Sequence, residues 1–419
     1  MTNSRENLQK TLNHQQPDRM VVDFGAGPVT GIHCLLVEKL RDHFGLEKKA
    51  VKVSEPFQML GEVEEDLQEA MGVDVIGVSP SSDMFGNPMK DWKEYRTPWG
   101  QVVLVPGSFT VSVDANGDTL MYPQGDASVA PSAKMPKVAY FFDAVNRQKP
   151  LDESKLNPED NVEEFTPISD SDLDYWKRVI PEAAQTGKGV MANFGGTGIG
   201  DIALVPGLNL KAPKGIRDVA DWYMSTLMRP DYLHYIFNKQ TDVALENLAK
   251  IKEIAGDQVD VAYICGTDFG TQDSSFCDPD TFESLYAPYY RKINNWIHEH
   301  TSWKTFKHSC GAVEPFMESF IASGFDIINP VQINAAGMDP LLLKQKYGDR
   351  LTFWGGGVDT QKVLPFGTPE EVKAHVRKQC EILSPGGGFV FTQIHNVQED
   401  VAPESFMTMW NTFQKNCRY

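Results

Sequence analysis

VDVAYICGTDFG (259–270), DTFESLYAPYYRKINNWIHEH (280–300) and WKTFKHSCG (303–311) follow one another closely along the chain. The two outer segments are short and apolar, as are strands buried on both faces of a parallel sheet. The middle segment has the length and apolar spacing of a helix. This strand–helix–strand order predicts a parallel sheet with helices packed against it.

The same alternation continues in both directions from this segment. Short apolar runs and helical patterns follow one another through the C-terminal half, and two earlier runs resemble strands. Because about eight strands can be counted, we expect a (β/α)8 barrel of the TIM type in preference to an open sheet. The further strand-like runs are 21–25, 73–79, 189–196, 325–332, 351–359 and 387–396, and the further helical patterns include 231–256 and 369–383.

We expect residues 1–419 to form a single barrel domain. Residues 81–170 differ from the rest, because they are rich in Pro, Gly, Asp and aromatic residues. Short apolar runs broken by turn residues predict a β-hairpin-rich insertion or elaboration of the barrel. It could cover the mouth and select substrate, or form a subunit contact.

Composition limits the classes of function. The formal net charge is −18 and no basic patch is evident, which argues against nucleic-acid binding. No apolar run approaches the roughly 18 residues of a membrane span, and the polar N-terminus lacks the apolar core of a signal peptide. Six sparse, irregularly spaced cysteines do not suggest a disulfide framework. We therefore expect a cytoplasmic protein without a membrane or nucleic-acid partner.

Polar residues gather at the carboxyl ends of the predicted strands, which is the face where a barrel builds its active site. We expect five of them to bind substrate, namely Asn193, Gln272, Asn329, Gln332 and Asp359.

His308 and Cys310 are two residues apart, so on an extended strand end their side chains point to the same side. Imidazole and thiolate are preferred zinc ligands, but a third ligand must come from another strand. His395 after the last strand is the leading candidate, and Cys265, Asp268 and Glu314 are alternatives.

Asp268 follows the strand at 259–265 and has three possible roles. It could orient an imidazole, contact the substrate, or simply cap a helix or loop. We expect Asp268 and His395 to be catalytic, with His308, Cys310 and His395 as metal ligands. A nucleophilic Cys310 activated by His308 is a weaker alternative, because neighbours on one strand are poorly placed for proton transfer.

Several segments together resemble the uroporphyrinogen decarboxylase superfamily, and the resemblance spans nearly the whole chain except residues 81–170. It implies a distorted (β/α)8 barrel. True decarboxylases of that superfamily use no metal and have an arginine-rich N-terminal motif, where this chain offers only Arg19. The segments are PDRMVVDFG (17–25), CGTDFGTQ (265–272), FKHSCGAVEPFMESFIASGFDIINPVQ (306–332), FWGGGVDTQKVLPFGTPEEV (353–372) and GGFVFTQIHNV (387–397).

A second branch of the superfamily contains zinc-dependent methyltransferases that work with a corrinoid protein. That branch is marked by His-x-Cys, which His308 and Cys310 match, and by a second cysteine near the final strand, where this chain has His395. The resemblance implies zinc, a small methyl donor or acceptor (a thiol or a methyl ether), and a corrinoid (cobalamin) carried by a partner protein. A metal-independent decarboxylase is the alternative. The direction of transfer and a possible homodimer stay open.

Overall fold

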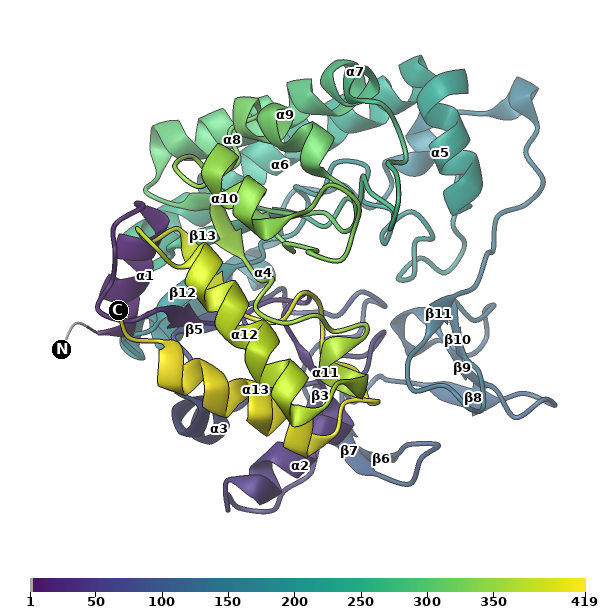
Figure 1. Ribbon diagram of the computed structural model, residues 1–419. Helices are drawn as coiled ribbons and strands as arrows, with labels where there is room; N and C mark the ends of the chain where they lie inside the picture. The colour runs from purple at the N-terminus through teal and green to yellow at the C-terminus, as the bar shows by residue number, and fades with distance from the viewer. Residues whose placement is uncertain (1–2) are drawn as a thin grey trace.

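Residues 3–419 are described by a computed structural model (Figure 1). Its centre is an eight-stranded sheet in which every neighbouring pair is parallel. The ring closes between its first two strands in the sequence, where the Asp74 amide donates a hydrogen bond to the Val22 carbonyl at 2.9 Å. The predicted (β/α)8 barrel is therefore confirmed. Its strands are β1 (Val21–Val22), β5 (Val75–Val78), β12 (Gly189–Ala192), β13 (Val261–Cys265), β14 (Lys304–His308), β15 (Ile327–Asn329), β16 (Thr352–Trp354) and β17 (Phe389–Phe391).

Helices surround this ring on its outer side (Figure 1). The segment at 280–300 forms one continuous helical run that ends at His300, close to the predicted bounds. No helix within residues 3–419 combines the length and the apolar character needed to cross a membrane. The helices are α1 (Ser4–Leu12), α2 (Cys34–His43), α3 (Glu65–Met71), α4 (Asp170–Gln185), α5 (Val219–Met228), α6 (Pro230–Ala255), α7 (Pro279–Thr281), α8 (Ala287–His300), α9 (Met317–Ala322), α10 (Pro340–Tyr347), α11 (Val363–Phe366), α12 (Pro369–Leu383) and α13 (Pro403–Asn416).

The barrel interior is filled by large apolar side chains. Tyr263, Phe306 and Trp354 pack ring against ring, with centroids 5.5 Å apart in each successive pair. At the amino-terminal end of the strands, Leu8 and Leu12 of α1 belong to the same buried cluster. A side chain in place of Gly189 would meet Leu8 at 2.1 Å, so α1 sits tightly against the start of β12. The candidate functional residues lie at the opposite, carboxyl end of the strands.

The additional sheets are insertions. Residues 81–170 lie between β5 and β12 and contribute six short strands. The first two extend a five-stranded sheet begun by residues 32–61, and the other four form a separate antiparallel sheet to one side of the barrel (Figure 1). The division into one barrel domain and one insertion stays a prediction. The additional strands are β2 (Ile32–His33), β3 (Val51–Glu55), β4 (Leu60–Gly61), β6 (Lys93–Arg96), β7 (Val102–Val105), β8 (Val111–Val113), β9 (Thr119–Met121), β10 (Ala133–Met135) and β11 (Asp143–Ala144).

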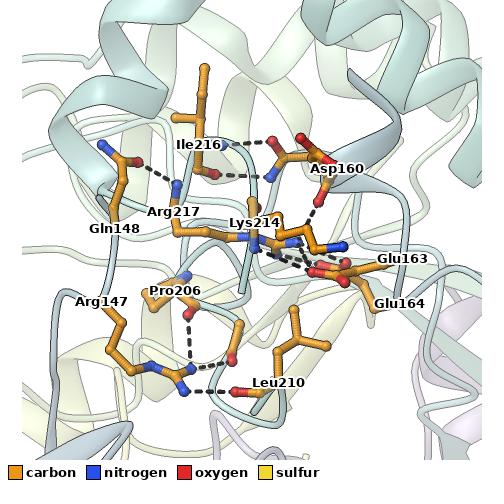
Figure 2. Close-up of polar contacts among 12 residues, drawn as sticks. Arg147, Gln148, Asp160, Glu163, Glu164, Pro206, Leu210, Lys214, Ile216 and Arg217 are labelled. Atoms are coloured by element: carbon orange, nitrogen blue, oxygen red, sulfur yellow. Dashed lines mark hydrogen bonds and ion pairs between the residues drawn. The ribbon is translucent and has the colours of Figure 1, made fainter. Parts of the chain in front are cut away.

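Two arginines join the end of this insertion to the loop that follows β12 (Figure 2). Arg147 donates to the carbonyls of Gly207 and Leu210, each at 2.6 Å. Arg217 is only 2% exposed and contacts the Glu164 carboxylate at 2.7 Å. Because α5 begins two residues after Arg217, these contacts fix the position at which that helix starts.

Candidate metal centre

Three potential ligands converge at the carboxyl end of the barrel. His308 is the last residue of β14, Cys310 follows two residues later, and His395 lies in the loop after β17. One donor atom from each residue lies within 4.8 Å of the others. Cys310 Sγ is 3.3 Å from His308 Nε2. The three residues can therefore share one metal ion.

The loop that carries His395 is held by the loop after β1. Gly31 is bonded from both sides: its amide donates to Asn396 Oδ1 at 2.6 Å, and its carbonyl accepts from Gln393 Nε2 at 3.2 Å. Gln393 and Asn396 are both buried, so these bonds are shielded from water. His395 is thus presented from a loop that two buried amides fix in place.

Asn329 determines which ring nitrogen of His308 carries the proton and which one can bind a metal. The Asn329 Nδ2 group donates to the Trp354 carbonyl at 2.7 Å, which turns its Oδ1 toward His308 Nδ1 at 2.6 Å. Because a carbonyl oxygen only accepts, His308 Nδ1 must carry the proton. The lone pair therefore sits on Nε2, the nitrogen that faces Cys310. This arrangement is typical of imidazoles that bind metals.

Burial sets the protonation of all three donors. It lowers the pKa of His308 to about 4 and that of His395 to about 4, so both rings are neutral at pH 7. Burial, with the nearby Asp268 charge, raises the pKa of the Cys310 thiol well above its usual range. A cation placed between the three would reverse this last effect, because it stabilises the thiolate. The electrostatics favour two neutral imidazoles and a thiol that ionises when metal binds.

Asp268 lies next to this group without belonging to it. Its Oδ1 accepts from the Cys310 amide at 2.7 Å and is 3.7 Å from His308 Nε2. Burial raises the pKa of the Asp268 carboxyl. The carboxyl therefore fixes the backbone at Cys310. It also lies near the donor atoms, where it could exchange a proton with a bound group.

The other proposed ligands lie elsewhere. Cys265 is buried at the end of β13 and interacts with the Tyr290 hydroxyl of α8, outside the ring of strands. The Glu314 carboxylate accepts from the Tyr347 hydroxyl at 2.7 Å and contacts Lys346 at 2.6 Å. Among residues 3–419, the group that could hold a metal is completed by His395.

The residues predicted to bind substrate have partners within the protein. Asn329 uses both ends of its amide, as described above. Gln332 accepts from the Gly311 amide at 2.7 Å and donates to Gln272 at 3.1 Å, bracing the loop that follows Cys310.

The two remaining residues predicted to bind substrate also hold loops. Asp359 accepts from the Gln361 amide at 2.7 Å, and Asn193 accepts from the Gly195 amide at 3.1 Å. Substrate binding by these residues stays a prediction.

Sequence reasoning missed a second half-buried carboxylate near the site. Asp201, in the loop after β12, accepts from the Gly266 amide at 3.0 Å. Burial, together with the charge of Asp268, raises the pKa of Asp201. The charges of both carboxylates also act on Tyr223 of α5, whose buried hydroxyl has no hydrogen-bond partner among residues 3–419. Asp201 lies nine residues beyond the end of β12, and no strand-end pattern marks it.

Comparisons with known proteins agree with the fold. Residues 211–416 match the family of uroporphyrinogen decarboxylase (URO-D), and this segment contains all three donors. A search of curated proteins found no match. Among solved structures, a methyltransferase from Methanosarcina mazei is similar over 99% of this chain and 99% of its own, with a TM-score of 0.53 and 12% sequence identity. The resemblance to the uroporphyrinogen decarboxylase superfamily is therefore confirmed over residues 211–416.

Proposed function

We propose that this protein is a zinc-dependent methyltransferase that moves a methyl group between a small thiol or methyl ether and a corrinoid protein. The observation that carries the proposal is the convergence of His308, Cys310 and His395 at the barrel mouth. A structural zinc site has four protein ligands, whereas a catalytic site has about three and keeps a position for substrate. Three donors at an active-site face therefore favour a catalytic role.

The donor set fits zinc. Imidazole nitrogen and thiolate sulfur are its preferred ligands, and His308 already presents a free Nε2 toward Cys310. Zinc bound here would act as a Lewis acid that lowers the pKa of a thiol or polarises a methylated oxygen. His395 stands where the resembling methyltransferases have a cysteine, so the ligand set carries one negative charge fewer. This difference favours ether oxygen over thiol as the atom that is activated.

The residues around the donors have separate tasks under this proposal. Asn329 keeps the His308 proton on Nδ1, away from the metal side. Asp268 holds the Cys310 backbone. It can also take or return the proton of an acceptor or leaving group, because burial raises the pKa of its carboxyl toward neutral pH.

A partner must bring the corrinoid to the mouth, and α5 offers an apolar surface beside it. Tyr223 faces the site from this helix, since the charges of Asp268 and Asp201 act on it. One turn further along the same helix, Leu227 is 75% exposed, and Met228 beside it in sequence is 66% exposed. Exposed apolar groups of this size at an active-site rim support docking of another protein.

The alternative, decarboxylation of a polycarboxylate, finds less support at Arg19. Both ends of its guanidinium contact the Asp74 carboxylate, at 2.6 and 2.5 Å. Arg19 precedes β1 and Asp74 precedes β5, so the pair lies at the amino-terminal end of the barrel, opposite the mouth. Arg19 is therefore not placed to bind substrate carboxylates there.

Metal content of the purified, unchelated protein tests the proposal. We expect about one zinc per chain. His308→Ala and Cys310→Ala should lose it, and His395→Ala should bind it more weakly. Cys265→Ala is the matched control, because it removes a buried thiol one strand away that faces α8. If the wild type takes up no zinc under reducing conditions, or if Cys265→Ala loses it equally, the proposed site is wrong.

A further inference from the structure

Tyr263 extends from the barrel interior to the mouth. Its ring packs against Phe306 inside the strands, and the residue is only 9% exposed. Its hydroxyl lies beyond the end of β13, because a β-carbon added to Gly266 would be 2.7 Å from the hydroxyl oxygen. The charges of Asp201 and Asp268 both act on this hydroxyl. The phenol therefore points out of the core toward the candidate metal centre.

The Tyr263 hydroxyl has no partner in the protein. Within residues 3–419 it makes no hydrogen bond. Burial raises the pKa of Tyr263 well above its usual range, so the hydroxyl keeps its proton and can donate it. A buried tyrosine hydroxyl normally finds a partner, so an exception beside an active-site face needs a physical reason.

The Asp201 carboxylate borders the same space. Its Oδ2 would be 3.0 Å from the β-carbon added to Gly266, on the side where the Tyr263 hydroxyl lies. The carboxylate already accepts from the Gly266 amide at 3.0 Å and from the Ala203 amide at 3.1 Å. Each carboxylate oxygen has two lone pairs, so each can accept a second hydrogen bond.

Tyr223 brings a second unpartnered hydroxyl from α5. Its ring stacks on that of Phe276, with centroids 4.6 Å apart and planes 15° apart, which fixes the direction of the hydroxyl. The charges of Asp201 and Asp268 act on this hydroxyl as they do on that of Tyr263. This side of the mouth therefore offers two hydroxyl donors and a carboxylate with spare acceptor capacity.

We propose that Tyr263, Asp201 and Tyr223 bind a hydroxyl group of the substrate, so that the substrate is a methyl ether that also carries a free hydroxyl. A hydroxyl donates to a carboxylate while it accepts from a phenol, and it is the smallest organic group that does both. A methyl ether without a hydroxyl leaves these groups unpaired and is therefore bound less tightly. The inference rests on the proposed function, because it names the substrate class for the same site.

Binding of two matched pairs of probes tests the proposal. The pairs are the monomethyl and dimethyl ethers of ethylene glycol and of trimethylene glycol, so the members of a pair differ only in whether the hydroxyl is free. In NMR titrations of the wild-type protein, at least one monomethyl ether should bind about fivefold or more tightly than its dimethyl partner. Tyr263→Phe should remove this preference by lowering the affinity for the monomethyl ether alone, and Tyr223→Phe should reduce it.

Tyr289→Phe is the matched control. Tyr289 of α8 is 7% exposed, and its hydroxyl donates to the His234 carbonyl at 3.0 Å. This substitution should lower the melting temperature and leave the preference unchanged. Tyr263→Phe should leave the melting temperature of the ligand-free protein unchanged, because it removes no hydrogen bond within the protein.

Equal affinity for both members of both pairs in the wild type would overturn the hydroxyl site, and so would a preference that Tyr263→Phe retains. The titrations are run on chelated and on zinc-loaded protein, which separates this inference from the proposed function. A hydroxyl preference in a protein that takes up no zinc would support the hydroxyl site and overturn the proposed metal site. Zinc uptake without a hydroxyl preference would do the reverse.

Discussion

Asn329→Leu should weaken metal binding without touching any ligand. The substitution removes the acceptor that holds the proton on His308 Nδ1, at 2.6 Å, and the donor to the Trp354 carbonyl, at 2.7 Å. His308 is then free to change tautomer and to rotate. Removing a partner of this kind typically costs about 10- to 100-fold in metal affinity, which is about 1.4 to 2.7 kcal/mol.

The same substitution has a separate cost in folding. His308 Nδ1 and the Trp354 carbonyl would both be left buried without partners, at about 1 to 3 kcal/mol each. Asn329→Asp separates the two effects, since a carboxylate still accepts from His308 but cannot donate to Trp354. We therefore expect Asn329→Asp to keep zinc affinity near the wild-type value while losing part of the stability.

The assay is competition for zinc against a chelating dye at pH 7, with thermal unfolding of the metal-free protein measured in parallel. Asn294→Leu is the control. Asn294 lies on α8 and is buried, and its Nδ2 donates to the Ser323 carbonyl at 2.7 Å. It should lower stability and leave zinc affinity unchanged. Wild-type zinc affinity in a folded Asn329→Leu variant would refute the assigned role of Asn329.

Other predictions concern acidity, metal removal and the insertion. Because the folded-state pKa of His308 is about 4 against 6.5 in the unfolded chain, the unfolded chain binds more protons as the pH falls between these values. Stability of the metal-free protein should therefore fall across that window, by up to ~3 kcal/mol from this group; chemical denaturation at several pH values should show a shallower loss in His308→Asn. Chelation should abolish methyl transfer and zinc should restore it, whereas full activity after chelation would favour the decarboxylase alternative. Arg217→Met should destabilise the protein by about 3 kcal/mol, since it leaves Glu164 without its buried partner; a melting temperature equal to that of the wild type would contradict this.

The barrel could be predicted because its strands are buried on both faces and its helices alternate with them, and both features are local. The sheet that β6 and β7 form with strands from residues 32–61 could not be predicted, because the sequence of a short strand does not specify which strand it pairs with. The convergence of the strand ends followed from the fold. The sequence alone therefore predicts that His308, Cys310 and His395 lie close together.

Residue type alone could not assign every polar side chain. Asn329 has the chemistry of a substrate contact and of a support for histidine, and only its two bonds within the protein point to the second. Asp201 lies in a loop without periodicity, so its approach to Gly266 depends on the course of that loop.

The seal that α1 makes at the amino-terminal end of the strands has a kinetic consequence. With Leu8 and Leu12 buried in the same cluster as the barrel interior, α1 closes this end of the barrel. Under the proposed function, the small substrate and the corrinoid partner would both approach the donors from the opposite end, the barrel mouth. Because transfer needs both at the site together, the small substrate must enter before the partner covers the mouth, so turnover should depend on how fast the partner departs as much as on the transfer itself.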